Sequence, residues 1–111
     1  MNVLFIVLNH EKHFDALLEA FKEHAIHGGT ILESQGLGVA SAENLSGMNY
    51  GYLRHILNEG RPYNKTLFLI LDDEKMDQVK KIVREVTGGI ERENQGIMFN
   101  FTLDSFEGLT K

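Results

Sequence analysis

Four of the histidines form two pairs whose spacing could hold a metal ion. His10 and His13 are three residues apart, and so are His24 and His27. Imidazoles at this spacing lie on one side of a helix and can bind one divalent ion together. Most of a helix, roughly 15–20 Å at 1.5 Å per residue, separates the two pairs, so one site cannot use both. The simpler interpretation is exposed polar side chains, favourable at a helix C-terminus for the second pair. We therefore predict no metal site.

Neighbouring carboxylates at 72–74 are the candidates for acid–base chemistry. Asp72, Asp73 and Glu74 follow an apolar run, where a new helix needs a side-chain cap and favours negative charge. Helix capping is the preferred interpretation. The sequence contains no cysteine, no Gly-x-Ser-x-Gly motif, no phosphate-binding loop and no zinc-helix motif. We therefore do not expect an enzyme, and an enzyme with an unrecognised cleft ranks last among the alternatives.

Glycines bracket the segment GGTILESQGLG at 28–38, after which residues 39–62 show no continuous strand or helix pattern. Glycine has no Cβ atom, so its backbone can approach a bound molecule closely. A connection as long as 39–62 inside a compact domain is usually functional or disordered. Apolar residues at helical spacing indicate a short helix at 49–58 within it. We expect this loop to order on a ligand or partner; a surface insertion without function is the alternative.

Composition limits the class of protein. The chain has 111 residues, 42% of them apolar, and a formal net charge of −5. This length predicts a single domain over residues 1–111, and the negative charge without a basic run disfavours nucleic acid. The apolar run at 3–8 is too short to cross a bilayer, so no direct membrane insertion is expected. We predict a cytoplasmic protein.

Apolar periodicity predicts six elements. Continuous apolar runs with β-branched residues indicate strands, and apolar residues at i, i+3, i+4 and i+7 indicate helices. The predicted strands are 2–9, 29–38, 65–73 and 95–103. The first predicted helix carries Phe14, Leu17, Leu18, Phe21 and Ala25 and stops at Gly28 or Gly29. The second carries Met76, Val79, Val83 and Val86 and ends at the TGG of 87–89. This order predicts an α+β, ferredoxin-like βαββαβ sandwich: a four-stranded antiparallel sheet with two helices on one face.

Two helices leave the other face of such a sheet uncovered. In the predicted strands at 2–9 and 65–73, however, both the odd-numbered and the even-numbered residues are apolar, so each strand would present apolar side chains to both faces. About seven large side chains would be exposed there, at a cost of roughly 10–20 kcal/mol in lost burial. Net domain stability is only about 5–15 kcal/mol. We therefore predict that other copies of the chain cover this face. Asn100 and Thr102 make the last strand look partly wet, which weakens the argument for that strand.

The succession of GGTILESQGLG, a long connection, KTLFLILDDEKMDQVKKIV, TGG and GIMFNFTLDSFEGL resembles the P-II family of nitrogen-regulatory signal proteins. It is most similar to the divergent P-II-like branch, over essentially the whole chain. The resemblance implies the ferredoxin-like fold and a homotrimer whose sheets pack around the three-fold axis. It also implies that 39–62 is the family's T-loop, which changes shape with ligand and touches partner proteins. A ligand, typically ATP or ADP, would sit in the clefts between subunits.

The resemblance also implies ligand-binding positions. Gly28 and Thr30 would lie near the adenine, and 36–38 would form the base of the loop. Thr87 and Gly88 match the start of a second ligand-facing segment, and a further glycine matches a position near its end. From the alternation along the predicted strand, Gln35 or Glu33 lines the cleft, or else both belong to a polar outer edge. The resemblance thus implies Gly28, Thr30, Gly36, Leu37, Gly38, Thr87, Gly88 and Gly96, and the alternation adds Gln35 as a candidate.

The chain departs from the family where phosphates would bind. Ile97 follows Gly96 in place of a basic residue, VAS at 39–41 replaces Arg-Gln-Lys, and 103–111 lacks the Arg-x-Arg. A triphosphate carries about four negative charges and needs charge-assisted contacts worth about 1.5–3 kcal/mol each. Tight ATP binding is therefore not expected. A less charged adenine nucleotide, another small metabolite and no ligand at all stay open.

Together these patterns favour a trimeric P-II-like signal-transduction protein that senses a small-molecule effector. It would regulate a protein partner, either a transporter or a metabolic enzyme, through the loop at 39–62. The alternative is a metal-binding trimer of the same fold that uses a histidine pair.

Overall fold

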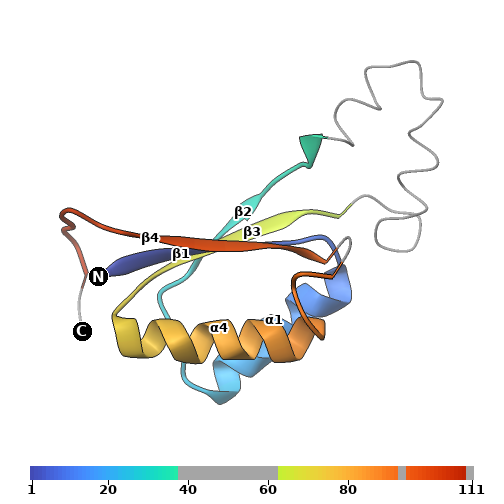
Figure 1. The fold of residues 1–111 in the computed structure, drawn as a ribbon, viewed down its shortest axis with the longest axis horizontal. Helices are drawn as coiled ribbons and strands as arrows, with labels where there is room; N and C mark the ends of the chain where they lie inside the picture. Colours follow the sequence, from blue (N-terminus) through green and yellow to red (C-terminus); the bar gives the residue numbers. More distant parts are fainter. Residues whose placement is uncertain (38–62, 93–94, 110–111) are drawn as a thin grey trace.

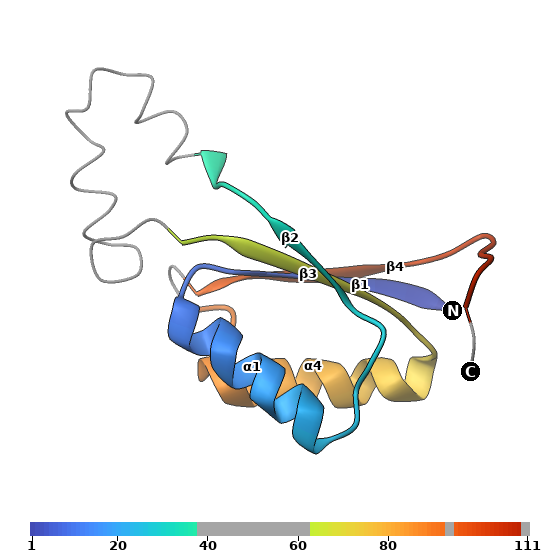
Figure 2. The same cartoon turned by 180° about the vertical axis from the view of Figure 1, so that it is seen from behind.

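The computed structural model describes residues 1–37, 63–92 and 95–109 (Figure 1). Within these ranges the elements are β1 (Asn2–Leu8), α1 (Glu11–Glu23), β2 (Thr30–Glu33), β3 (Lys65–Leu71), α4 (Asp73–Thr87) and β4 (Gly96–Thr102). The four described strands form one antiparallel sheet in the order β2-β3-β1-β4. Both helices lie against the same face of this sheet (Figure 2). The predicted α+β architecture is thus confirmed, and it is compatible with a ferredoxin-like fold.

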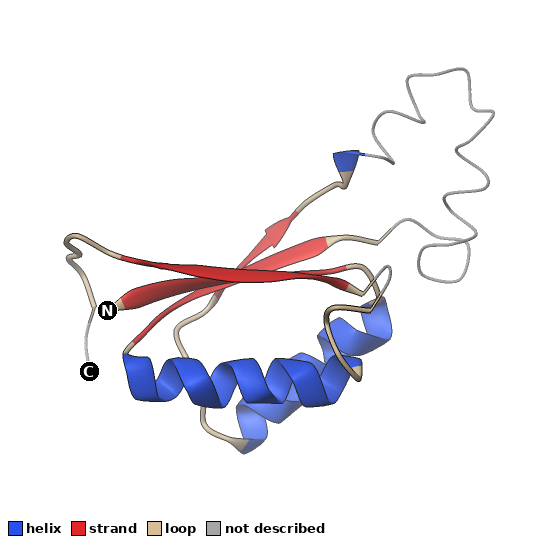
Figure 3. Ribbon diagram, viewed as in Figure 1, coloured by secondary structure: helices blue, strands red, loops and turns tan. Residues whose placement is uncertain are grey.

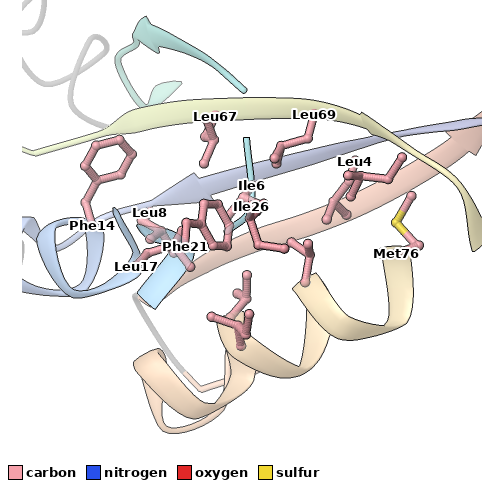
Figure 4. Packing of buried hydrophobic residues seen from close by; sticks show 14 residues of the cluster. Leu4, Ile6, Leu8, Phe14, Leu17, Phe21, Ile26, Leu67, Leu69 and Met76 are labelled. Atoms are coloured by element: carbon pink, nitrogen blue, oxygen red, sulfur yellow. The ribbon is translucent and has the colours of Figure 1, made fainter. Parts of the chain in front are cut away.

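The core lies between the sheet and the two helices (Figure 4). Because side chains alternate along a strand, every second residue of β1 and β3 faces the helices. The predicted stripe of α4 packs against them, and so do Phe14, Leu17 and Phe21 of α1. The prediction was wrong for two residues of the first stripe, because Leu18 is 37% exposed and Ala25 lies exposed beyond the end of α1. The buried cluster is Leu4, Ile6, Leu8, Phe14, Leu17, Phe21, Ile26, Leu67, Leu69, Leu71, Met76, Val79, Ile82 and Val83. This layer holds α1 and α4 against the strands whose ends carry the candidate site.

Both ends of α4 follow the sequence signals. Asp72 is the N-cap, and its side chain accepts a hydrogen bond of 2.8 Å from the backbone N–H of Lys75. Asp73 and Glu74 lie in the first turn, where the helix dipole favours carboxylates. At the other end Gly88 is left-handed, with φ 75°, and stops the helix after Thr87. The capping interpretation of the carboxylates is therefore confirmed.

The end of α1 differs from the prediction. The helix stops at Glu23 rather than near Gly28, and Ala25 takes the left-handed conformation with φ 55°. Backbone hydrogen bonds from Ile26 N to Phe21 O (2.8 Å) and from Ala25 N to Lys22 O (3.3 Å) close the turn. This pattern is a Schellman motif, and burial of Ile26 in the core explains why the chain turns early.

Strand β2 is shorter than the predicted strand at 29–38. Its four residues pair with β3 from Thr30 opposite Phe68 to Glu33 opposite Lys65. Glu33 pairs with Lys65, which is the first residue of β3, so the ladder between the two strands ends there. The predicted loop at 39–62, its predicted helix at 49–58 and Gly38 lie outside the described residues.

Candidate functional site

Both helices lie on one side of the sheet, and we call the opposite side the open face (Figure 3). Residues paired directly across antiparallel strands project to the same side, so the register assigns them. The open face consists of Val3, Phe5, Val7, Thr30, Leu32, Thr66, Phe68, Ile70, Ile97, Phe99 and Phe101. None of these residues is charged. No described helix covers them, so the prediction of an apolar uncovered face is confirmed.

Phenylalanines concentrate at the centre of the open face. The ring of Phe5 stacks on Phe99 at 5.1 Å between centroids and lies 6.1 Å from Phe101 and 5.4 Å from Phe68. Phe99 and Phe101 remain 43% and 50% exposed. Both rings already pack against Phe5, so the surface is preformed before anything binds to it.

The polar residues of β4 do not lie on the open face, which corrects the expectation that this strand is partly wet there. Asn100 pairs with Leu4, whose side chain is in the core, and so projects toward the helices. Its Oδ1 accepts a hydrogen bond of 2.6 Å from Nζ of Lys80 on α4. Thr102 donates to Oδ1 of Asn2 at 3.1 Å on the same side. The open-face positions of β4 are therefore apolar throughout.

A second feature is polar and lies where β1 ends and β3 and β4 begin; we call it the polar sheet end. Asn64 Nδ2 donates to Asn9 Oδ1 at 3.0 Å, and Asn9 N donates to the backbone oxygen of Gln95 at 3.1 Å. Three buried side-chain atoms have no hydrogen-bond partner among the described residues: His13 Nδ1, Tyr63 Oη and Gln95 Oε1. Buried polar atoms normally have partners, so a ligand, ion or water is expected beside each of these atoms.

Burial changes the acid–base behaviour of this end. Burial, and next the carboxylates of Asp15, Glu11 and Glu33, raise the pKa of the Tyr63 phenol to about 12. Burial, and next the neighbouring positive charges, lower the pKa of the His13 imidazole. Both shifts in pKa favour the neutral form of the side chain.

At two of the predicted ligand positions the fold itself requires a glycine, whether or not a ligand binds. A Cβ atom on Gly96, at φ 148°, would collide with the carbonyl oxygen of Val7 in the neighbouring strand. Gly88 is the left-handed residue that ends α4. Gly36 is different: no described atom lies within 4 Å of the place a Cβ would take, and its φ is not in the left-handed range. The described fold does not require glycine there, which fits a role in contact with something outside the chain.

The other predicted positions are mostly exposed. Gly28, at φ 83°, and Thr30 lie at the start of β2, and Leu37 is 83% exposed beyond its end. Gln35 lies past the end of β2, so it does not continue the alternation with Glu33. Glu33 forms an ion pair of 3.5 Å with Lys65 on the neighbouring strand. This contact fits the alternative in which Glu33 belongs to a polar outer edge of the sheet.

Thr87 is buried at the end of α4, with 3% of its surface exposed. Its hydroxyl donates to the Val83 carbonyl at 2.9 Å and accepts from Gly89 N at 3.3 Å. The hydroxyl is thus engaged within the helix end.

Apart from Thr87 and Gly88 at the end of α4, the described predicted positions lie at opposite edges of the sheet. Residues 28–37 belong to the β2 edge, and Gly96 opens β4 at the other edge, with β3 and β1 between them. Three strand intervals of about 4.8 Å separate the edges by roughly 14 Å. One chain alone does not bring the two groups into one pocket.

Sequence reasoning missed Tyr63, Asn64 and Gln95. A signal was present: Tyr63 and Asn64 come just before the predicted strand at 65–73, Gln95 is the first residue of the predicted strand at 95–103, and Asn9 is the last of the one at 2–9. In an antiparallel arrangement these positions meet at one end of the sheet, so polar residues there could have been grouped in advance.

Comparison with family models finds none that matches the chain, and no curated protein matches its sequence. The fold and the two surfaces define a small α+β sandwich with one sheet face left apolar. Among the described residues, no helix has the length and apolar character needed to span a membrane.

Proposed function

We propose that the chain is a P-II-like signalling protein that forms a homotrimer through its open face. Small-molecule effectors, with an adenine nucleotide as the first candidate, bind in the clefts between copies. The segment 39–62 then reports the bound state to a protein partner. The observation that carries the proposal is the continuous apolar open face on a sheet of this topology.

The energetics favour covering this face. Eight of its large apolar side chains are half-buried or exposed, from Leu32 on β2 to Phe101 on β4. Completing the burial of such a side chain is worth about 1 kcal/mol, half of the usual 1.5–3 kcal/mol for full burial. The total, of the order of 8 kcal/mol per chain, is comparable with the whole stability of a domain.

A second copy fits the open face better than a nucleic acid does. Sheets that bind single strands combine exposed aromatic rings with positive charge along the backbone path. The rings are present here in Phe5, Phe68 and Phe99, but no open-face residue is charged and the chain carries a net charge of −5. An uncharged apolar surface complements another surface of its own kind.

Shared clefts follow from the placement of the predicted ligand positions. The group at 28–37 lies at the β2 edge of the sheet, and Gly96 opens β4 at the opposite edge of the same chain. In a closed trimer the β2 edge of one copy comes near the β4 edge of the next, so two copies supply what one cannot. Gly36, which the described fold does not require to be glycine, then permits close approach of the ligand.

The test is a ligand panel on the purified chain, with thermal unfolding as the measurement. AMP, ADP, ATP, cyclic dinucleotides, 2-oxoglutarate and bicarbonate are each added at millimolar concentration. A ligand at a hundred times its Kd stabilises by about 2.7 kcal/mol, which shifts the midpoint measurably. We expect at least one nucleotide to raise the midpoint, and AMP or ADP to match or exceed ATP. If the chain is a trimer and no compound of the panel raises its midpoint of thermal unfolding, the proposed effector role is contradicted.

A further inference from the structure

The two histidine pairs have the same spacing in the sequence but different surroundings in the structure. At the end of α1, Nδ1–H of His24 donates to the Ala20 carbonyl at 2.9 Å. At the start of α1, the rings of His10 and His13 contact each other edge to face, with centroids 5.2 Å apart and planes at 73°. His24 therefore caps the end of α1, whereas His10 and His13 hold two imidazoles side by side.

The spacing of the His10 and His13 rings suits a shared ion. Zinc–nitrogen bonds are about 2.0–2.1 Å long, so two nitrogens on one tetrahedral ion lie about 3.3 Å apart. Ring centroids 5.2 Å apart allow one nitrogen of each ring to approach this separation by rotation of the side chains. His10 stands at the N-cap and, unlike Asp72 on α4, makes no side-chain capping hydrogen bond, so its ring is not held by the helix.

His13 shows a need for a partner. Its Nδ1 is buried and has no hydrogen-bond partner among the described residues. An unpaired buried nitrogen is costly, because it has lost its water without gaining another contact. An ion bound between the two rings fixes the orientation of the His13 ring and supplies such a contact.

The surroundings select the class of ion. In the described part of the chain no three His, Cys, Asp or Glu side chains come together, so the site offers two nitrogens and leaves the remaining positions to water. Mg²⁺ is held mainly by negative oxygens, and no described carboxylate joins the two imidazoles in a group, so the pair does not suit such hard ions. Neutral imidazoles instead suit zinc, copper and nickel. We propose that His10 and His13 form a two-imidazole site for a divalent late transition ion.

The test is a Zn²⁺ titration of the full chain by isothermal calorimetry, with Mg²⁺ as the oxygen-preferring comparison. The variants are His10→Asn and His13→Gln, and the matched control is the double variant His24→Asn/His27→Gln. Asparagine is a favoured N-cap, so His10→Asn removes a ligand while preserving the start of α1. Circular dichroism confirms that each variant is folded.

We expect one Zn²⁺ per wild-type chain and no response to Mg²⁺. Loss of either ligand should weaken zinc binding at least about tenfold, since even changes behind a metal ligand cost that much. The His24/His27 control should bind zinc like the wild type. Absence of zinc binding to the wild-type chain, or an equal loss in the control, would overturn the assignment. Neither result bears on nucleotide binding or on the trimer, which are measured separately.

Discussion

Phe5 of β1 and Phe99 of β4 stack with their ring planes only 2° apart, at a centroid distance of 5.1 Å. The two rings belong to neighbouring strands, and Phe99 keeps 43% of its surface exposed. A rigid aromatic pair in the middle of an apolar face has little entropy to lose on binding, which is typical of residues that dominate interfaces.

Replacing Phe99 by aspartate should dissociate the proposed trimer. A buried carboxylate without a partner is strongly unfavourable, and loss of a central interface residue commonly costs about 2 kcal/mol or more. The matched control is Leu18→Asp, because Leu18 is 37% exposed on α1, away from the sheet. Sedimentation velocity should show a smaller particle for Phe99→Asp alone. Equal sedimentation of the two variants would argue against the open face as the interface.

Ala25→Gly should stabilise the chain. Ala25 holds φ 55° in the Schellman turn after α1, and this conformation costs a residue with a Cβ roughly 1–2 kcal/mol, part of which glycine recovers. We expect the free energy of unfolding in urea to rise by about 0.5–1 kcal/mol. Ala16→Gly, at an exposed helical position of α1, should lower it by about 1 kcal/mol. A loss of stability in both variants would show that Ala25 is not left-handed.

Two glycines among the predicted ligand positions should respond differently to alanine. Gly96→Ala places a Cβ against the Val7 carbonyl oxygen and should destabilise the chain by about 1–3 kcal/mol. Gly36→Ala meets no described atom within 4 Å, so the unliganded midpoint of thermal unfolding should stay unchanged. If a nucleotide binds, Gly36→Ala should remove its stabilising effect. Retention of that effect would exclude Gly36 from the ligand contact.

Tyr63 should make stability fall at high pH. Its pKa is raised to about 12 in the folded chain, against an ordinary value of 10.0, with burial as the first cause. Between these values the unfolded chain releases the phenolic proton and the folded chain keeps it, so the free energy of unfolding decreases as pH rises above 10. Urea unfolding of the wild type and of Tyr63→Phe should be compared between about pH 9 and pH 12. The free energy of unfolding should fall more steeply with pH in the wild type, by an amount that corresponds to the shift in pKa. Parallel declines would mean that the Tyr63 phenol is not shielded from water.

Most of the fold could be predicted because its signals are local and strong. Apolar runs located β1 and β3, and the stripe from Met76 to Val83 located the buried side of α4. The end of α1 could not be predicted, because burial of Ile26 outweighs the local preference for glycine at the turn. Tertiary packing decided that boundary, and a single sequence does not display it.

The site was predicted less completely. The apolar open face could be predicted from the alternation of side chains along strands that are apolar throughout. The side of the sheet on which Asn100 lies depends instead on the register between β4 and β1. The separation of Gly36 from Gly96 across the sheet likewise depends on strand order. The contrast between the two histidine pairs required the ring positions of His10 and His13, because the two pairs have equal spacing in the sequence.

Sedimentation equilibrium of the wild-type chain at micromolar concentration tests the central proposal most directly. A chain whose open face is covered by its own copies should give three times the mass of 12.6 kDa. The mass should stay constant on dilution until unfolding begins, because the apolar face stabilises the chain only in the assembly. A stable, folded species of one chain mass over the same range would contradict the assembly, and with it the clefts in which the effector is proposed to bind.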